Sequence, residues 1–261
     1  MTFYSATLLS RYKRFLSDVR LADSQVITAH CPNTGSMRNC LLEESRCYLS
    51  HSPNPKRKYA YTLEVVTTPD GDLAGINTAR ANGLVARAID EGVITQLQGY
   101  ATRLAEQKYG AENSRIDWLL RDHVSDSRPC YVEVKNLTLL EEGYGQFPDA
   151  VSERGSKHLR ELMALALQGT RAVLVFCVSH SGVKRVKPAD QIDTRYGQLL
   201  RNAAANGVEI LAYQAEFIFE AGTLQDIRLV RPLPVGLSPC VVKPKEIVEI
   251  GEAGIERPLV E

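Results

Sequence analysis

The sequence lacks the features of a disulfide-rich, zinc-binding or membrane-spanning protein. Its six cysteines are widely spaced and form no C-x-x-C pair, which argues against a zinc ribbon and, in a chain of 261 residues, against a disulfide framework. No run approaches the roughly twenty apolar residues of a membrane span. The first residues, "MTFYSATLLSRYKRFLSDV", carry charges where a signal peptide needs an apolar core. We therefore expect a soluble, cytoplasmic protein with reduced cysteines and no membrane partner.

The chain also lacks net charge, since 31 Lys and Arg balance 31 Asp and Glu. This balance gives no global sign of a nucleic-acid partner, although residues 1–80 hold ten basic against seven acidic side chains. A Walker loop, a Rossmann fingerprint and a nucleophile elbow are all missing from the sequence. The corresponding nucleotide-binding and hydrolase classes are therefore not supported, while a local basic groove remains compatible with the composition.

Residues 1–78 read as an all-β domain. Their β-branched and aromatic segments partly alternate, contain no long helical pattern, and are separated by turns. Closely spaced strands of this number and size predict an OB-like barrel. The expected strand segments are "ATLLSRYKRFLSDVRL", "SQVITAHC", "SRCYLSHS" and "YAYTLEVVTT", and the turns are "PNTG", "SPNP" and "PDGD".

Residues 79–234 read as an α/β domain with a mixed central sheet. The segment 79–92 has helical spacing, with Leu84, Val85, Ala88 and Ile89 on one face. Strands, a Gly-rich loop, a long helix, a buried strand, another helix and a last strand follow, an order that predicts a sheet covered by helices. Residues 235–261 contain several prolines and little periodicity, which predicts an extended tail.

Three charged residues interrupt otherwise strand-like sequence. Asp117 stands alone within the apolar "RIDWLL", and "CYVEVK" places Glu133 and Lys135 on one face of a strand, with Val132 and Val134 on the other. The polar loop between the two segments suits adjacent strands. One interpretation is a solvated edge with a weak Glu–Lys pair. The other is a metal site, because an unpaired buried carboxylate in a strand is costly unless it meets a cation.

The metal interpretation implies specific chemistry. Asp117 and Glu133 would supply hard oxygen ligands to Mg²⁺ or Mn²⁺, and such ions bind through few carboxylates while keeping several waters. Lys135 could position or deprotonate a water, or stabilise charge at a phosphate. We therefore predict Asp117, Glu133 and Lys135 as catalytic candidates.

Basic side chains cluster at the start of the long helix and in two barrel segments. Cations near a helix N-terminus are disfavoured by the helix dipole unless an anion is expected there, and a phosphate backbone is such an anion. The alternative is a solvated basic face balanced by nearby acids. The predicted nucleic-acid contacts are Arg154, Lys157, His158 and Arg160 on the helix, and Arg11, Lys13, Arg14, Lys56, Arg57 and Lys58 on the barrel.

Several segments together resemble the bacterial sugar fermentation stimulation protein family, in the same order from about Leu8 to Phe217. These segments are "RYKRFLSDV", "HCPNTGSM", "KRKYAYTLE", "KYGAENSRIDWLL", "YVEVKNLTL" and "FPDAVSERGSKHLRELM". The resemblance implies an OB-fold domain followed by a domain similar to the PD-(D/E)-x-K nucleases. In those nucleases the Asp and the E-x-K bind divalent metal, and here these positions fall on Asp117, Glu133 and Lys135.

The resemblance further implies an additional acidic ligand from the helix before the sheet, for which Glu91 is the first choice and Glu106 the weaker one. It implies binding of DNA with little sequence preference and a role in regulating sugar (maltose) metabolism. Three hypotheses follow: a DNA-binding regulator with a nuclease-like metal site, which we rank first; an active Mg²⁺-dependent endonuclease; and a sugar or small-molecule binding protein.

Overall fold

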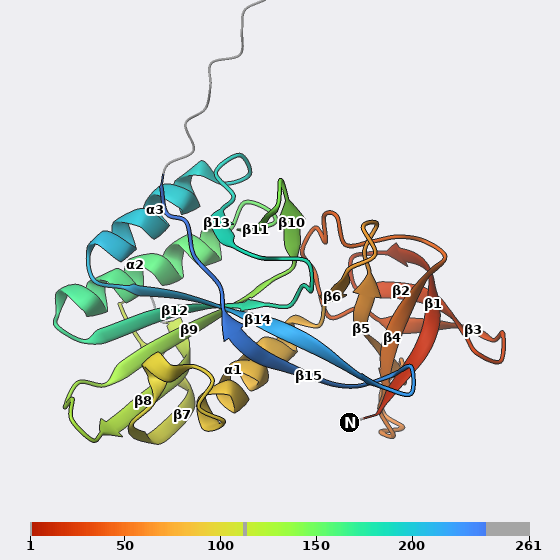
Figure 1. The fold of residues 1–261 in the computed structure, drawn as a ribbon, viewed down its shortest axis with the longest axis horizontal. Coiled ribbons are helices and arrows are strands. Elements are labelled where there is room, and N and C mark those ends of the chain that lie inside the picture. Colours follow the sequence, from red (N-terminus) through yellow and green to blue (C-terminus); the bar gives the residue numbers. More distant parts are fainter. Residues whose placement is uncertain (1, 112–113, 239–261) are drawn as a thin grey trace, which may run out of the picture.

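The computed structural model describes residues 2–111 and 114–238, and its first part is a small β-barrel (Figure 1). The strands run in the order β3-β2-β1-β4-β5-β6, and the pairing of His30 with Thr62 joins β3 to β5. Leu8, Val19 and Leu49 point into its core and are almost fully buried. The all-β barrel predicted for the N-terminal part is thus confirmed. Its strands are β1 (Phe3–Tyr12), β2 (Leu16–Leu21), β3 (Val26–His30), β4 (Ser45–His51), β5 (Tyr61–Thr67) and β6 (Leu73–Gly75).

The second part is built on a six-stranded mixed sheet of order β15-β14-β12-β9-β8-β7. β12 is parallel to β9 and β14, while the outer pairs β7–β8, β8–β9 and β14–β15 are antiparallel. The sheet strands are β7 (Tyr100–Tyr109), β8 (Ser114–His123), β9 (Cys130–Leu137), β12 (Arg171–Val178), β14 (Glu209–Glu220) and β15 (Thr223–Pro232).

Helices cover both faces of this sheet, which confirms the predicted α/β architecture (Figure 1). On one face Val85 and Ile89 of the first α-helix pack with Val132 and Val134. On the other face Leu159 and Leu162 pack with Phe176. The helices are the short 3-10 turns η1 (Thr78–Arg80) and η2 (Thr95–Leu97), and the α-helices α1 (Ala81–Asp90), α2 (Glu153–Leu167) and α3 (Thr194–Ala205).

Two features of the second part differ from the sequence-based prediction. The region expected to be a Gly-rich loop contains β11 (Tyr144–Phe147), which lies in a separate three-stranded sheet between β10 (Leu139–Glu141) and β13 (Val186–Pro188). The strand β15 was not predicted, because its sequence "TLQDIRLVRP" mixes charges into the apolar pattern. It forms because it pairs with β14 from Tyr213 to Glu220.

The beginning of the predicted tail is attached to the second part. Gly236 donates its amide to the carbonyl of Val186, and Arg201 donates to the carbonyl of Leu237. Residues 236 and 237 of the predicted tail are thus hydrogen-bonded to the second part. Residues 239–261 of the predicted tail lie outside the described residues.

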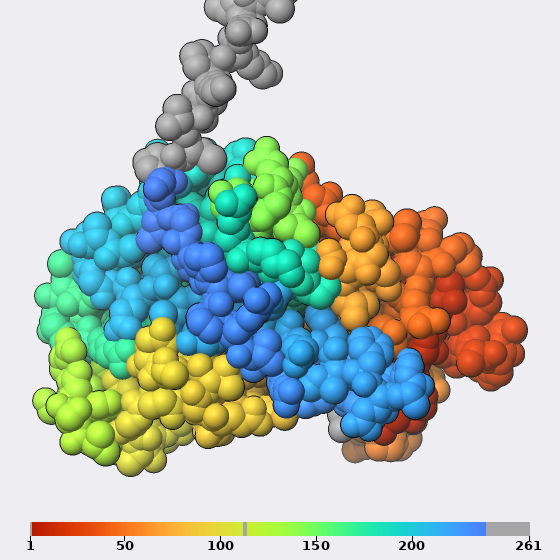
Figure 2. All heavy atoms as spheres, viewed as in Figure 1, coloured from red at the N-terminus to blue at the C-terminus, as the bar shows by residue number. Residues whose placement is uncertain are grey.

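A backbone seam joins the barrel to the second part. Gly75 donates its amide to the carbonyl of Ser179, Ser181 donates to Leu73, and Ala74 pairs with His180. In the space-filling view the barrel forms a lobe at one end of the molecule that touches the second part along its side (Figure 2). This seam places barrel loops beside the strands that carry Asp117 and Glu133.

Candidate functional site

Asp117 lies at the point where β8 and β9 separate. Their pairing ends at Trp118 and Val132, so the amide of Val134 has no strand partner on that side. The Asp117 carboxylate takes its place: Oδ2 accepts the Val134 amide at 2.7 Å, and Oδ1 accepts the Asn82 side-chain amide at 2.7 Å. Burial, and then repulsion from Glu133, raise the pKa of Asp117. The two strands thus open to expose a carboxylate that is poorly neutralised.

Asn82, in the first turn of α1, orients the Asp117 carboxylate. The sequence analysis did not select this residue. Its side chain reaches Asp117, and its carbonyl accepts the indole N–H of Trp118 at 3.1 Å. A polar side chain on the otherwise apolar face of a helix is the sequence signal that would have identified it. The helix beginning is therefore positioned by two bonds from β8.

Glu133 and Lys135 lie on the same face of β9, as the alternation predicts. Lys135 donates from Nζ to Glu133 Oε1 at 2.6 Å, and His158 Nδ1 of α2 contacts the same oxygen. Burial alone would raise the pKa of Glu133, but these partners outweigh it and hold the pKa below its usual value. Glu133 is only 2% exposed, and its other oxygen, Oε2, has no hydrogen-bond partner in the described part of the chain.

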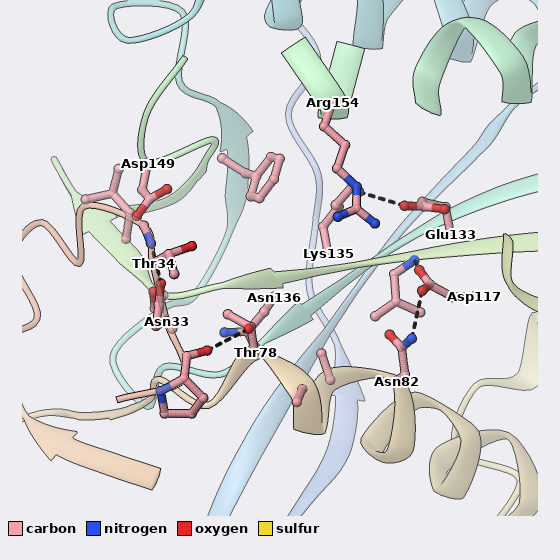
Figure 3. Close-up of a pocket in the computed structure, with 18 of the residues that line it drawn as sticks. Asn33, Thr34, Thr78, Asn82, Asp117, Glu133, Lys135, Asn136, Asp149 and Arg154 are labelled. Carbon is pink, nitrogen blue, oxygen red and sulfur yellow. Dashed lines mark hydrogen bonds and ion pairs between the residues drawn. The ribbon is translucent and has the colours of Figure 1, made fainter. Parts of the chain in front are cut away.

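These residues line a cavity of about 490 Å³ between the barrel and the second part. In Figure 3, Asn82 reaches Asp117 from below, Lys135 and Arg154 end near Glu133, and Asn33 and Thr34 of the barrel lie at the opposite end. Much of the remaining lining is uncharged and polar: Thr78, Asn136, Thr138 and Gln146. The cavity therefore combines the acidic pair Asp117 and Glu133 with many uncharged hydrogen-bonding groups, and Asp149 lies at the end with Asn33 and Thr34.

The two candidates for an additional acidic ligand are placed very differently. Glu91 does not line the cavity, because it follows the C-terminal end of α1 and pairs with Arg87 at the surface. Its assignment as a metal ligand is therefore corrected: it is Asn82, at the other end of the helix, that meets Asp117. Glu106 does line the cavity, opposite Asp117 in the β7–β8 register and with a left-handed backbone at φ 55°.

The donor set of the cavity is small. Within residues 2–111 and 114–238, no group of three or more His, Cys, Asp and Glu side chains is gathered as a metal-binding cluster. Four carboxylates line the cavity: Asp117 and Glu133, which lie close enough to repel each other, Glu106, and Asp149, which lies beside Gly35 of the barrel loop. The pair Asp117 and Glu133 is the candidate ligand set. Such a set fits Mg²⁺ or Mn²⁺, which bind through one or two carboxylates and keep waters, and does not fit a structural zinc site.

The basic residues predicted on α2 separate into different environments. Arg154 is exposed and lines the cavity, whereas Arg160 lines another hollow beside Gly110 and Glu161. Lys157 is half-buried. His158 is 5% exposed and contacts Glu133, so its prediction as a phosphate contact is corrected: burial leaves it no access to a ligand at the surface.

Arg11 is likewise a structural residue and not a free cation. Its Nη2 donates to the carbonyls of Asn33 at 2.8 Å, Gly35 at 3.0 Å and Arg14 at 2.8 Å. It therefore holds the loop 32–36, which forms the barrel side of the cavity. Its predicted role in contacting nucleic acid is corrected to one of ordering this loop.

The loop 32–36 is also fixed from the second part of the molecule. Ser36 donates its hydroxyl to Asp149 Oδ2 at 3.0 Å, and Met37 donates its amide to the same oxygen at 3.2 Å. A Cβ on Gly35 would lie 2.8 Å from that carboxylate and 2.9 Å from Asn33 Oδ1. Only glycine therefore fits here without displacing the contact between the two parts.

The other barrel cations are exposed and share one end of the barrel. The register pairs Tyr12 with Leu16, Leu16 with His30, and His30 with Thr62, so these strand ends are neighbours. The turn between β1 and β2 carries Lys13 and Arg14, both with positive φ. The loop between β4 and β5 carries Lys56, Arg57 and Lys58. The loop that lines the cavity starts at this same end, directly after His30.

Comparison with known proteins decides the family. A profile of the "Sugar fermentation stimulation protein RE domain" matches residues 79–220, and one of the "SfsA N-terminal OB domain" matches residues 9–76. The chain belongs to the sugar fermentation stimulation protein (SfsA) family. This confirms the resemblance noted in the sequence and the OB assignment of the barrel.

Individual relatives agree with this assignment. The sugar fermentation stimulation protein homolog of Teredinibacter turnerae is 64% identical over 212 residues, covering 81% of this chain and 89% of its own length. That of Saccharophagus degradans is 58% identical over 220 residues, covering 84% of this chain and 93% of its own. The structure of Pyrococcus furiosus SfsA in complex with Ca²⁺ is similar with a TM-score of 0.77 and 28% identity, covering 90% of this chain and 98% of that one.

The helices of the described part were also compared with the requirements of a membrane span. None of them combines the length and the apolar character needed to cross a bilayer.

Proposed function

We propose that this SfsA-family chain binds DNA across its interdomain cavity and holds a divalent metal ion there through Asp117 and Glu133. The observation that carries the proposal is the Oε2 atom of Glu133, which is buried in the cavity wall without a hydrogen-bond partner among the described residues. Leaving a buried carboxylate oxygen unsatisfied is unfavourable. A bound cation would satisfy this oxygen and would also neutralise Asp117.

The metal would be Mg²⁺ or Mn²⁺, and Asp117 and Glu133 would hold it in the cavity that Glu106 also lines. Such an ion supplies a Lewis acid for a phosphodiester and a water of lowered pKa. Support comes from the related P. furiosus SfsA, whose structure is described as a complex with Ca²⁺. Ca²⁺ and Mg²⁺ are both hard cations that take oxygen ligands.

DNA is the proposed partner because cations surround the acidic site without filling it. Arg154 lines the cavity, and the barrel turns with Lys13, Arg14 and residues 56–58 lie at the barrel end where the cavity loop begins. Backbone phosphates would be held by these cations, and a metal ion would offset the repulsion between phosphate and the carboxylates. The uncharged polar side chains of the lining, such as Thr78, Asn136 and Gln146, suit sugar and base groups.

Metal binding is tested by calorimetric titration of Mn²⁺ into the purified protein and three variants. Asp117→Asn and Glu133→Gln should weaken Mn²⁺ binding by at least about tenfold, since even changes behind the ligands cost about 10–100-fold. Glu91→Gln is the matched control and should bind as the wild type does, because Glu91 pairs with Arg87 outside the cavity. Equal affinities for all four proteins would exclude the proposed site.

A second candidate function is an active metal-dependent endonuclease. It is favoured by Lys135, whose Nζ lies 2.6 Å from Glu133 Oε1 and which lines the cavity where a scissile phosphate would lie. There it could stabilise charge at the phosphate or hold a proton of an attacking water. Supercoiled and branched DNA incubated with Mg²⁺ or Mn²⁺ should be cleaved by the wild type and not by Lys135→Ala. Binding of both DNA substrates without cleavage would exclude the endonuclease and support DNA binding only.

A role in regulating sugar metabolism is supported by the family name, "Sugar fermentation stimulation protein". That maltose metabolism is the regulated process, as a consequence of DNA binding, stays a proposal. Direct sugar binding is the least supported hypothesis. The single tryptophan, Trp118, donates its indole N–H to Asn82 and lies under the guanidinium of Arg103 at 5.1 Å. Its ring therefore offers no free face for stacking on a sugar.

A further inference from the structure

Three aromatic side chains that do not line the acidic cavity gather on the outside of the barrel. His51 of β4 and Tyr61 of β5 are direct cross-strand partners with ring centroids 4.9 Å apart. Tyr4 of β1 approaches both, at 6.4 Å from His51 and 6.0 Å from Tyr61, each in an edge-to-face arrangement. His51 is exposed, Tyr61 is half-buried, and Tyr4 is 42% exposed. We call these three residues the aromatic cluster.

A basic loop adjoins the aromatic cluster directly. Residues 52–60 leave β4 after His51 and enter β5 at Tyr61, and they contain three cations and no acidic residue. Arg57 donates to the hydroxyl of Thr62 at 3.0 Å, and the ammonium of Lys58 lies 5.4 Å from the ring of Tyr59. The described residues give Lys56, Arg57 and Lys58 no carboxylate partner. Positive charge and exposed ring surface therefore occur side by side.

This combination is more than a sheet needs for its own stability. Cross-strand aromatic pairs do stabilise a sheet, but that role is served equally by half-buried rings whose charged neighbours are paired. Tyr100 and His123 provide such a pair in the second part: they are cross-strand partners at 4.6 Å, and the nearby Arg171 is paired with Glu209. The aromatic cluster differs by its exposure and by its unpaired cations.

We propose that the aromatic cluster and the loop 52–60 form a stacking site for single-stranded nucleic acid. Successive unpaired bases would stack on the ring faces while the loop cations hold the backbone, which is how sequence-tolerant single-strand sites work. A duplex hides its base faces and would gain only the charge contacts. Single strand is therefore the occupant that uses both features.

The position of the aromatic cluster relates it to the cavity. Thr62, which follows Tyr61, pairs with His30, and His30 is separated by one residue from Pro32 of the cavity wall. A strand held on the cluster and the loop would thus be continued toward Asp117 and Glu133. This inference rests on the proposed function, and it adds that DNA reaches the metal site as an unpaired strand.

The test is fluorescence anisotropy of labelled oligo(dT) and of a duplex of equal length, with the full chain and leucine variants that keep apolar bulk. The double variant Tyr4→Leu/Tyr61→Leu should weaken oligo(dT) binding on the order of tenfold or more, with duplex affinity changed less than about twofold. Tyr100→Leu, from the half-buried pair in the second part, is the matched control and should leave both affinities unchanged.

Other results would overturn the proposal in distinct ways. Unchanged oligo(dT) binding together with a lower unfolding temperature in the double variant would assign the cluster to sheet packing only. Equal losses of affinity for oligo(dT) and for the duplex would mean that the site contacts only the phosphate backbone and not the bases. If the double variant loses no single-strand affinity while Asp117→Asn still loses Mn²⁺, the stacking site fails and the proposed metal site stands. A wild-type chain that binds neither DNA would refute both.

Discussion

Asp117 and Glu133 share one cavity, yet their protonation equilibria are shifted in opposite directions. Burial and the neighbouring Glu133 raise the pKa of Asp117, whereas His158 and Lys135 lower that of Glu133 despite its burial. Glu133 is therefore kept charged by the protein itself. Asp117 is the carboxylate whose charged form would be stabilised most by an added cation. A metal ion bound between the two carboxylates would therefore lower the raised pKa of Asp117.

His158 is the residue whose removal should most disturb this balance. His158→Ala deletes a buried contact to Glu133 Oε1 and leaves that carboxylate with Lys135 alone. We expect the free energy of unfolding to fall by about 1.5–3 kcal/mol, the typical contribution of a hydrogen bond to a charged group. Urea denaturation measures this change.

The control for this variant lies on the same helix. Arg154→Ala, one turn earlier and exposed, should stay within about 0.5 kcal/mol of the wild type, as surface substitutions usually do. If both variants were equally stable, the contact of His158 with Glu133 would have no structural weight.

The residues of the site differ in how well the sequence predicts their environment. Alternation placed Glu133 and Lys135 on one face, and the isolated Asp117 within an apolar segment indicated an unusual environment. His158 was misassigned because a histidine among Arg and Lys on a helix reads as part of a basic face. Which of those side chains turns inward depends on the rotation of α2 on the sheet, set by Leu159 and Leu162 packing against Phe176.

At the scale of elements, α1 was predicted well in extent and incorrectly in function. Val85, Ala88 and Ile89 are buried as the helical spacing requires. The helical spacing does not tell which end of the helix faces the site, and the prediction placed the C-terminal end with Glu91 there. The fold selects the other end, because Asp117 and Trp118 both bond to Asn82 in the first turn.

The loop 32–36 depends on Arg11 in a way that can be measured. Arg11→Ala removes the donor to the carbonyls of Asn33 and Gly35. We expect faster amide hydrogen exchange over residues 33–37 and a several-fold loss of DNA affinity, because the barrel wall of the cavity is no longer ordered. Exchange followed by mass spectrometry tests the first effect.

The variant Arg14→Ala distinguishes the ordering of the loop 32–36 from the loss of a positive charge. Arg14 is exposed in the hairpin turn and contributes to Arg11 only its carbonyl, which alanine retains. It should lower the salt dependence of DNA binding by about one phosphate contact, with exchange in residues 33–37 unchanged. Exchange that is unaffected by Arg11→Ala would mean that Asp149 alone holds the loop.

At the scale of the whole molecule, the site depends on how the barrel docks on the second part. The sequence predicts both parts but offers no pattern for their contact, which is made by backbone pairing of Leu73 and Gly75 with residues 179–181. Backbone contacts leave little trace in side-chain periodicity. The cavity between the parts, and the contribution of Asn33 to it, were therefore beyond sequence reasoning.

This seam contains a buried histidine that should make stability depend on pH. His180 is 1% exposed and accepts the Gly182 amide at 3.1 Å; burial lowers its pKa, against the opposing effect of Asp72 and Asp70. Below a pH of about 6.5 the unfolded chain binds a proton at this residue that the folded chain resists. Stability is thus full above that pH and falls as the pH decreases from about 6.5 toward the lowered folded-state pKa.

The effect is measured by urea denaturation at pH 7.5 and pH 5.5. His180 should account for a loss of up to about 1.4 kcal/mol between these conditions. His180→Asn, whose side-chain oxygen can accept the Gly182 amide, should lose correspondingly less. An identical pH dependence in both proteins would show that the histidine is not held neutral at the seam.

The central claim is that Asp117 and Glu133 bind a divalent metal ion in the interdomain cavity. Its most direct test is anomalous X-ray diffraction from crystals of the protein grown or soaked with Mn²⁺. We expect one strong anomalous peak within coordination distance of the carboxylates of Asp117 and Glu133, and no such peak in Asp117→Asn. A cavity without such a peak, or a peak bound only at other carboxylates, would contradict it.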